Sequence, residues 1–139
     1  MRILGLDLGT RTLGIAISDI TETIASFYGT IRFEEEQYDS AILKLKTIID
    51  EEKVQKIVLG LPKNMNNSVG DAAIRCLKFK ILLEQSFKLE VVMQDERLST
   101  KEATSYLIES DMSRKKRKKK VDSVAASIIL QTYLDRKRD

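Results

Sequence analysis

The sequence predicts an α/β fold built on a central mixed sheet of five strands, three antiparallel and then two parallel, with helices on both faces. Two short apolar runs at 2–8 and 12–18 are separated by a Gly-Thr-Arg turn, which is typical of a β-hairpin. Residues 56–61 form an unbroken apolar run, as in a strand buried on both faces. Later segments alternate between helical and strand patterns, which indicates a partly parallel sheet covered by helices.

The other elements follow in chain order. Residues 24–33 are rich in β-branched and aromatic side chains and predict a third, antiparallel strand. The spacing of apolar residues predicts a helix over 38–52, and a fifth strand is expected at 89–93. A capping-box pattern begins a helix at about 100–109. The last helix is expected over 121–134.

A further helix is predicted over about 70–85. We expect Ala73, Leu77 and Ile81 to lie on its inner side. Cys76 is interpreted as a small residue on the buried face of the same helix.

This order of elements, three hairpin-linked strands followed by alternating helices and strands, is that of the ribonuclease H-like architecture. The 139 residues fit one domain, 1–139, with a mobile basic loop at about 112–120. Because ligands of such sheets gather at the carboxyl ends of the central strands, polar residues at those ends are the first candidates for a site.

The composition, 42% hydrophobic and 32% charged, predicts a soluble cytoplasmic protein. No apolar run approaches the roughly 20 residues of a membrane-spanning helix, and no leader pattern precedes the first strand. We therefore expect neither membrane association nor export. The single cysteine excludes an internal disulfide and is typical of a reducing compartment.

The chain contains no histidine. Its absence excludes Ser-His-Asp and Cys-His catalysis as well as the usual zinc sites. Hydrolytic chemistry would therefore depend on carboxylates, most simply with hard cations such as Mg²⁺ or Mn²⁺.

Asp7 lies in the middle of the first apolar run, where a carboxylate is costly to bury unless a cation meets it. Two interpretations are open. Asp7 can bind a metal ion, or the hairpin can hold nucleotide phosphates on its backbone amides, as in actin-like ATPases and sugar kinases. Those proteins need a second lobe and a second phosphate loop, which this chain lacks, so the metal interpretation is favoured.

Asp95, Glu96 and Arg97 follow the fifth strand. Because neighbouring side chains of an extended chain face opposite sides, only one of the two acids can readily face a metal shared with Asp7. We favour Glu96 for its longer reach and keep Asp95 in reserve. Arg97 can bind a phosphate or form a structural ion pair.

Asp122 precedes the last apolar helix and has two interpretations. It can cap that helix, or it can be a third metal ligand, because positions 126, 129 and 133 on the same helical face are Ala, Ile and Tyr. Three carboxylates at one rim repel each other unless divalent cations lie between them. Two ions about 3.5–4 Å apart would serve the hydrolysis of a phosphodiester.

Positive charge is concentrated near the C-terminus: residues 1–113 carry a net charge of −4 and residues 114–139 one of +7. Residues 114–120 are seven consecutive basic residues. We expect them to form a solvated loop in the free protein and to contact nucleic-acid phosphates in a complex. The expected phosphate-binding residues are Lys63, Arg97, Arg114, Lys115, Lys116, Arg117, Lys118, Lys119 and Lys120.

Four motifs resemble the bacterial YqgF/RuvX family, Holliday-junction-resolvase relatives within the ribonuclease H-like superfamily. They are GLDLGTRTLGIAISD at 5–19, IVLGLPKNMNNSVG at 57–70, DERLSTKEA at 95–103 and KKVDSVAASIILQTYL at 119–134. The resemblance covers almost the whole chain. One departure is Asn67, where the family often has glycine.

The resemblance implies a metal-dependent nuclease that processes the 5′ end of the precursor of 16S ribosomal RNA, with the acidic motif positions at Asp7, Glu96 and Asp122. Resolution of DNA junctions is the alternative reaction, and a homodimer would match the two-fold symmetry of a junction. A non-catalytic nucleic-acid-binding module is the alternative from another class.

Overall fold

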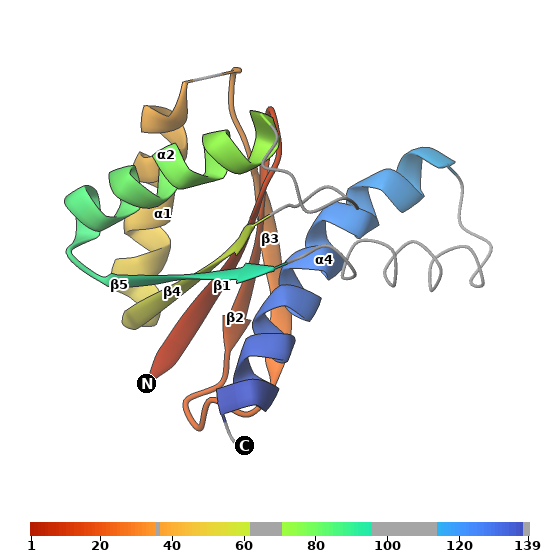
Figure 1. Ribbon diagram of the computed structural model, residues 1–139. Helices are drawn as coiled ribbons and strands as arrows, with labels where there is room; N and C mark the ends of the chain where they lie inside the picture. The colour runs from red at the N-terminus through yellow and green to blue at the C-terminus, as the bar shows by residue number, and fades with distance from the viewer. Residues whose placement is uncertain (36, 62–70, 96–113, 138–139) are drawn as a thin grey trace.

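The computed structural model describes residues 1–35, 37–61, 71–95 and 114–137, with the backbone alone at 71, 72, 95, 114–124 and 137. Five strands form one sheet in the order β3-β2-β1-β4-β5 (Figure 1). Pairing is antiparallel for β1 with β2 and β2 with β3, and parallel for β1 with β4 and β4 with β5. The predicted mixed sheet is confirmed. Its strands are β1 (Arg2–Leu8), β2 (Thr12–Ser18), β3 (Ala25–Arg32), β4 (Val54–Leu61) and β5 (Glu90–Asp95).

Helices cover both faces of the sheet, as predicted. They are α1 (Tyr38–Glu52), α2 (Asp71–Phe87) and α4 (Arg114–Lys137). Figure 1 shows α1 and α2 on one face and α4 on the other. Two separate apolar clusters result, one of which contains residues of α1 and α2 and the other residues of α4.

The alternation of side chains along β1 decides which residues face which helices. Leu4, Leu6 and Leu8 belong to the cluster beneath α1 and α2, whereas Ile3 belongs to the cluster beneath α4. Because successive side chains of a strand point to opposite faces, Asp7 shares the α4 face with Ile3. The carboxylate therefore does not point into the larger apolar core.

Helix α4 runs antiparallel to β1. Its C-terminal half lies at the start of the strand, where the Gln131 side chain accepts from the Ala25 backbone N–H at 2.9 Å and donates to the Thr23 carbonyl at 3.0 Å. Nearer the middle of the strand, the Ala126 carbonyl oxygen lies 3.2 Å from the position that a Cβ on Gly5 would take. The N-terminal half of α4 is therefore directed toward the carboxyl end of β1.

Two predictions about the last helix are wrong. The helix begins at Arg114 rather than at 121, so the backbone of the basic residues 114–120 is helical instead of forming a loop. Lysine and arginine are good helix formers, and this propensity outweighs the repulsion between like charges. Asp122 consequently lies inside α4 and is not its N-cap.

The predicted inner face of α2 is also partly wrong. Leu77 is 43% exposed and Ile81 is 54% exposed. The residues that this helix buries are Ala73, Cys76, Phe79 and Leu83. The expectation for Cys76 is confirmed. Apolar residues occur all around α2, so periodicity alone could not select the side that packs on the sheet.

The helix predicted over about 100–109 lies outside the described residues. In the part of the chain that the structure describes, no helix is long and apolar enough to cross a membrane.

Candidate functional site

Asp7 occupies a row of residues that crosses the sheet on the α4 face, near the carboxyl ends of the parallel strands. Its partner on β2 is Gly14. On the other side, Leu6 pairs with Leu59 of β4, so Gly60 is the β4 residue level with Asp7. Gly60 in turn pairs with Gln94 of β5. The row therefore reads Gly14, Asp7, Gly60, Gln94.

All four residues of the row face α4. Each is preceded by a residue whose side chain packs in the opposite core, beneath α1 and α2: Leu13, Leu6, Leu59 and Met93. Side-chain alternation then places the row on the other face. The residues level with Asp7 on both adjoining strands are glycines, which lets a ligand approach the backbone closely. The Asp7 carboxylate is partly exposed rather than buried.

Position 122 of α4 is carried toward the same end of the sheet as Asp7. It lies one helical turn before Ala126, the residue whose carbonyl oxygen approaches Gly5. Four helical residues advance about 6 Å, and the two residues from Gly5 to Asp7 advance about 6.6 Å along the strand. Because α4 runs antiparallel to β1, the step from Ala126 back to 122 and the step from Gly5 to Asp7 both lead toward the carboxyl end of β1.

The remaining predicted site residues divide into two groups. Asp95 is the last residue of β5 and pairs with Leu61, and the basic positions 114–120 form the first turns of α4. Lys63, Glu96 and Arg97 lie outside the described residues. Among the described residues, no group of three or more His, Cys, Asp or Glu side chains is placed to hold a metal ion. The meeting of the three predicted carboxylates is therefore a prediction.

Gln94 is a residue of the row that sequence reasoning missed. Gln94 is only 6% exposed. Ser18, which is 2% exposed, is the other buried polar residue among those that the structure describes. The signal in the sequence is a single amide at the end of the apolar strand segment Val91–Met93, directly before the predicted acidic positions. Such a residue is easily taken for the start of a polar turn.

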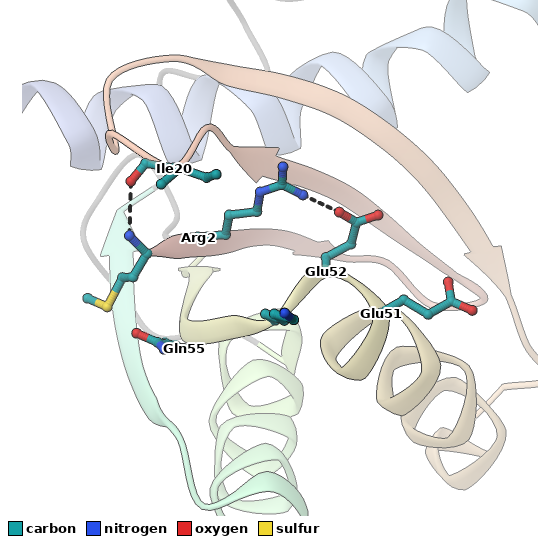
Figure 2. Close-up of a pocket in the computed structure, with 7 residues that line it drawn as sticks. Arg2, Ile20, Glu51, Glu52 and Gln55 are labelled. Carbon is teal, nitrogen blue, oxygen red and sulfur yellow. Dashed lines mark hydrogen bonds and ion pairs between the residues drawn. The ribbon is translucent and has the colours of Figure 1, made fainter.

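A cavity of about 310 Å³ lies at the other end of the sheet, and Figure 2 shows its lining. Arg2 and Glu52 point toward each other there and form an ion pair (Figure 2). The α-amino group of Met1 donates to the Ile20 carbonyl oxygen at 2.9 Å. Because its acidic and basic side chains are paired in part and Asp7 is remote from it, this cavity is not the candidate site.

Comparisons with known proteins identify the family of the chain. The sequence profile of the family described as "RuvX: Holliday junction resolvase" matches residues 1–136. The chain belongs to this family. A relative from Geobacillus sp. (strain WCH70), named "Putative pre-16S rRNA nuclease", is 51% identical over 138 residues, which are 99% of this chain and 100% of that protein.

Solved structures of junction-resolving enzymes share the fold of this RuvX-family chain. The Thermus thermophilus RuvC structure in complex with a Holliday junction substrate superposes with a TM-score of 0.62 at 10% identity, over 99% of this chain and 96% of that one. The fowlpox virus resolvase, in complex with Holliday junction DNA, gives a TM-score of 0.59 at 15% identity over the whole of both chains. The ribonuclease H-like fold predicted from the order of elements is confirmed.

Proposed function

We propose that this RuvX-family chain is a nuclease that hydrolyses phosphodiester bonds in the 5′ leader of the precursor of 16S ribosomal RNA, acting as one domain over 1–139. The full-length similarity to a relative named for that activity supports the substrate. The observation that carries the reaction is the partly exposed Asp7 carboxylate between Gly14 and Gly60, at the carboxyl end of the central strands. Ligand sites of open α/β sheets occur at this end.

The carboxylates of Asp7, Glu96 and Asp122 are proposed to hold two divalent cations, Mg²⁺ or Mn²⁺. The chemistry of Asp7 fits such ions, because hard cations prefer carboxylate oxygens and the flanking glycines leave room for hydrated ligands. Glu96 is preferred to Asp95 because its side chain is longer and reaches farther from the end of β5. Position 122 is supported by the antiparallel course of α4 along β1.

The reaction joins a water oxygen to phosphorus and breaks one phosphorus–oxygen bond, and the departing oxygen takes a proton. Divalent cations, when bound, supply an activated water and stabilise the departing oxygen. The chain's own carboxylates fix where the reaction occurs. The basic side chains of Lys63, Arg97 and residues 114–120 are proposed to bind phosphates of the nucleic-acid strand and to set its position.

The direct test uses the full chain with Mn²⁺ or Mg²⁺ and two substrates side by side, a 16S precursor with its 5′ leader and a four-way DNA junction. Asp7→Asn should abolish cleavage while leaving the circular dichroism spectrum and salt-sensitive binding unchanged. Asp50→Asn, an exposed position on α1 on the opposite face of the sheet, is the matched control and should cleave like the wild type. Cleavage by a clean Asp7→Asn preparation at the wild-type rate would refute the site.

The same experiment separates the alternatives. Cleavage of the junction but not of the precursor would favour a resolvase. Salt-sensitive binding to nucleic acid without cleavage by the wild type would favour a non-catalytic binding module. ATP binding by calorimetry, also without cleavage, would favour the kinase-like interpretation.

The location and the assembly of the chain are proposed on separate grounds. The single cysteine, Cys76, is buried, which is compatible with the reducing cytoplasm where ribosomal RNA is processed. A homodimer is supported by three exposed apolar residues, Ile74, Leu77 and Ile81, at helical spacing on one side of α2. Light scattering after size-exclusion chromatography should give twice the mass of one chain for the wild type. Leu77→Glu should give the mass of a single chain.

A further inference from the structure

Arg75 is a half-buried arginine on α2 whose Nε atom is buried and has no hydrogen-bond partner. It is the one such side-chain nitrogen or oxygen in the part of the chain that the structure describes. The other half-buried basic side chains among the described residues each pair with a glutamate: Arg2 with Glu52, Lys56 with Glu90, and Lys80 with Glu84. The described residues therefore hold the Arg75 cation without providing an acceptor for it.

The two Nη groups of Arg75 are the part of the side chain that a ligand can reach. They form no hydrogen bond with a described residue, and Nε is the only buried atom left without a partner, so the Nη groups are accessible to solvent. Two parallel N–H groups of a guanidinium match two oxygens of a phosphate or carboxylate. The side chain is thus suited to bind an oxyanion that comes from outside the described residues.

The course of α2 places Arg75 near the same end of the sheet as Asp7. Because β4 and β5 are parallel and α2 lies between them in the chain, α2 runs from the carboxyl end of β4 back to the amino end of β5. Arg75 lies about one turn from the start of this helix. Figure 1 shows the start of α2 at the end of the sheet where β1 and β4 finish.

Aromatic contacts fix the first turns of α2 relative to the end of β1. The ring of Phe79, one turn after Arg75, lies 5.6 Å from the ring of Tyr38 at the start of α1. Tyr38 in turn lies 5.6 Å from Phe33. The Phe33 N–H donates at 2.9 Å to the carbonyl oxygen of Arg11, in the turn that follows β1. The place of Arg75 beside the carboxyl end of β1 is therefore set by packing.

The proposed function brings phosphates to this end of the sheet. Asp7 faces α4, whereas α2 covers the opposite face, so Asp7 and Arg75 lie on either side of the sheet's edge. A strand that is cleaved at Asp7 and continues across this edge presents its next phosphates to Arg75. The basic positions 114–120 belong to α4, so positive charge is available on both sides of the cleavage position.

We propose that Arg75 binds a phosphate of the nucleic-acid strand on the α2 side of the Asp7 site and thereby positions the strand for cleavage. The inference rests on the proposed nuclease function and deepens it. It adds a contact on the face opposite α4, and it predicts a minimum length of strand beyond the cleavage position.

The test is the binding of a fluorescently labelled single-stranded RNA that spans the 5′ cleavage site of the 16S precursor. Anisotropy is measured with the full chain and without divalent cations, so that the strand stays intact. Arg75→Gln should weaken binding about 10-fold at low salt, as expected for the loss of a charge-assisted contact. The slope of log affinity against log salt should become shallower by about 0.7, the value for one phosphate of a single strand.

Two further variants are matched to this one. Arg75→Lys should keep the wild-type salt slope but recover only part of the affinity, because lysine retains the charge and lacks the planar fork. Arg136→Gln removes the same charge from an exposed position near the end of α4, at the other end of the sheet, and should bind like the wild type.

Substrate length and stability supply readouts that a purely structural role would not produce. When the RNA is shortened stepwise from each end, the wild type should lose affinity at the step that removes the phosphate bound by Arg75. Arg75→Gln should show no loss at that step, because the contact is already missing. The same variant should unfold at the same or a higher temperature than the wild type, because it removes a buried donor without a partner.

The outcomes separate this inference from the proposed function. Wild-type affinity and salt slope in Arg75→Gln would overturn the role of Arg75 alone, and so would an identical length dependence in the two proteins. A loss of binding accompanied by a lower unfolding temperature and no length effect would indicate a structural role and would also overturn it. Failure of the wild type to bind either this RNA or a four-way DNA junction would overturn the proposed function, and with it the inference.

Discussion

A Cβ atom added to Gly5 would lie 2.6 Å from the Cβ of Leu130, closer than real Cβ contacts occur. Helix α4 therefore rests directly on the backbone of β1. The Ala126 carbonyl oxygen lies 3.2 Å from the same position. Because Asp7 is two residues after Gly5 and Asp122 one turn before Ala126, this contact determines the spacing between the strand and the helix that carry two of the proposed ligands.

Substitution of Gly5 by alanine should destabilise the protein and reduce cleavage. The new methyl group meets the Leu130 Cβ and the Ala126 backbone rather than the flexible end of a side chain, so α4 must move. Overpacking of this kind costs about 1–3 kcal/mol. Urea unfolding should show the loss. The control is Gly29→Ala on β3, where an added Cβ meets nothing within 4 Å, and equal stability of the two variants would contradict the contact.

Two leucines of α2 offer a matched test of which side of this helix is buried. Leu83 is 0% exposed and Leu77 is 43% exposed. Leu83→Ala leaves a cavity beneath the helix and should lower the free energy of unfolding by about 2–5 kcal/mol. Leu77→Ala should lower it by less than about 1 kcal/mol, because surface substitutions have small effects. Chemical denaturation of both variants measures the difference, and a reversed order would mean that α2 packs by its other side.

Neutralising the basic turns of α4 should weaken nucleic-acid binding and flatten its dependence on salt. Replacing the Lys and Arg residues at 114–120 with glutamine removes charge but keeps good helix formers. Each lost phosphate contact should reduce the slope of log affinity against log salt by about 0.7–0.9.

A second variant with Gly and Ser at the same positions also removes helix propensity. Fluorescence anisotropy at several salt concentrations compares the two. Neither variant carries the basic side chains, so the comparison isolates the helical backbone at 114–120. If the helix itself is needed, the Gly/Ser variant should cleave more slowly than the glutamine variant when the same fraction of each is bound to nucleic acid. An unchanged salt slope in both would show that these residues do not meet phosphates.

Asp19 should make stability depend on pH in the acid range. Its Oδ1 accepts from the Ile24 N–H at 3.0 Å and from the Thr23 N–H at 2.8 Å, and the Thr21 hydroxyl donates to Oδ2. These bonds, that of Ile24 first, lower the pKa of Asp19 from 3.8 to about 2. A lowered pKa in the folded state means that the stabilisation is complete above about pH 4. It is lost as the pH falls through about 2.

The measurement is the free energy of unfolding of the wild type and of Asp19→Asn between pH 5 and pH 2. The asparagine cannot titrate, so the difference between the two should shrink as the pH falls below 4. A carboxyl titration followed by NMR should place the pKa of Asp19 near 2. A difference that stays constant across this range would contradict the assignment.

Local patterns predicted most of the elements because their signals are local. The Gly-Thr-Arg turn gives the hairpin of β1 and β2, where the Gly9 N–H donates to the Thr12 carbonyl at 2.7 Å. The apolar run of β4 follows from burial on both faces. Local patterns failed where two tendencies competed. At 114–120 charge repulsion argued for a loop and propensity for a helix, and the chain is helical there.

The amino-acid sequence by itself determined the order of the strands along the chain and the family, because these follow from residue types and their spacing. Only the tertiary structure decided which residues lie on the same face of the sheet and which lie side by side on neighbouring strands. The approach of α4 to β1 and the register that aligns Gly14, Asp7, Gly60 and Gln94 depend on contacts between segments far apart in the chain. Burial and strand register are properties of the packed sheet, and no local pattern around Gln94 contains them.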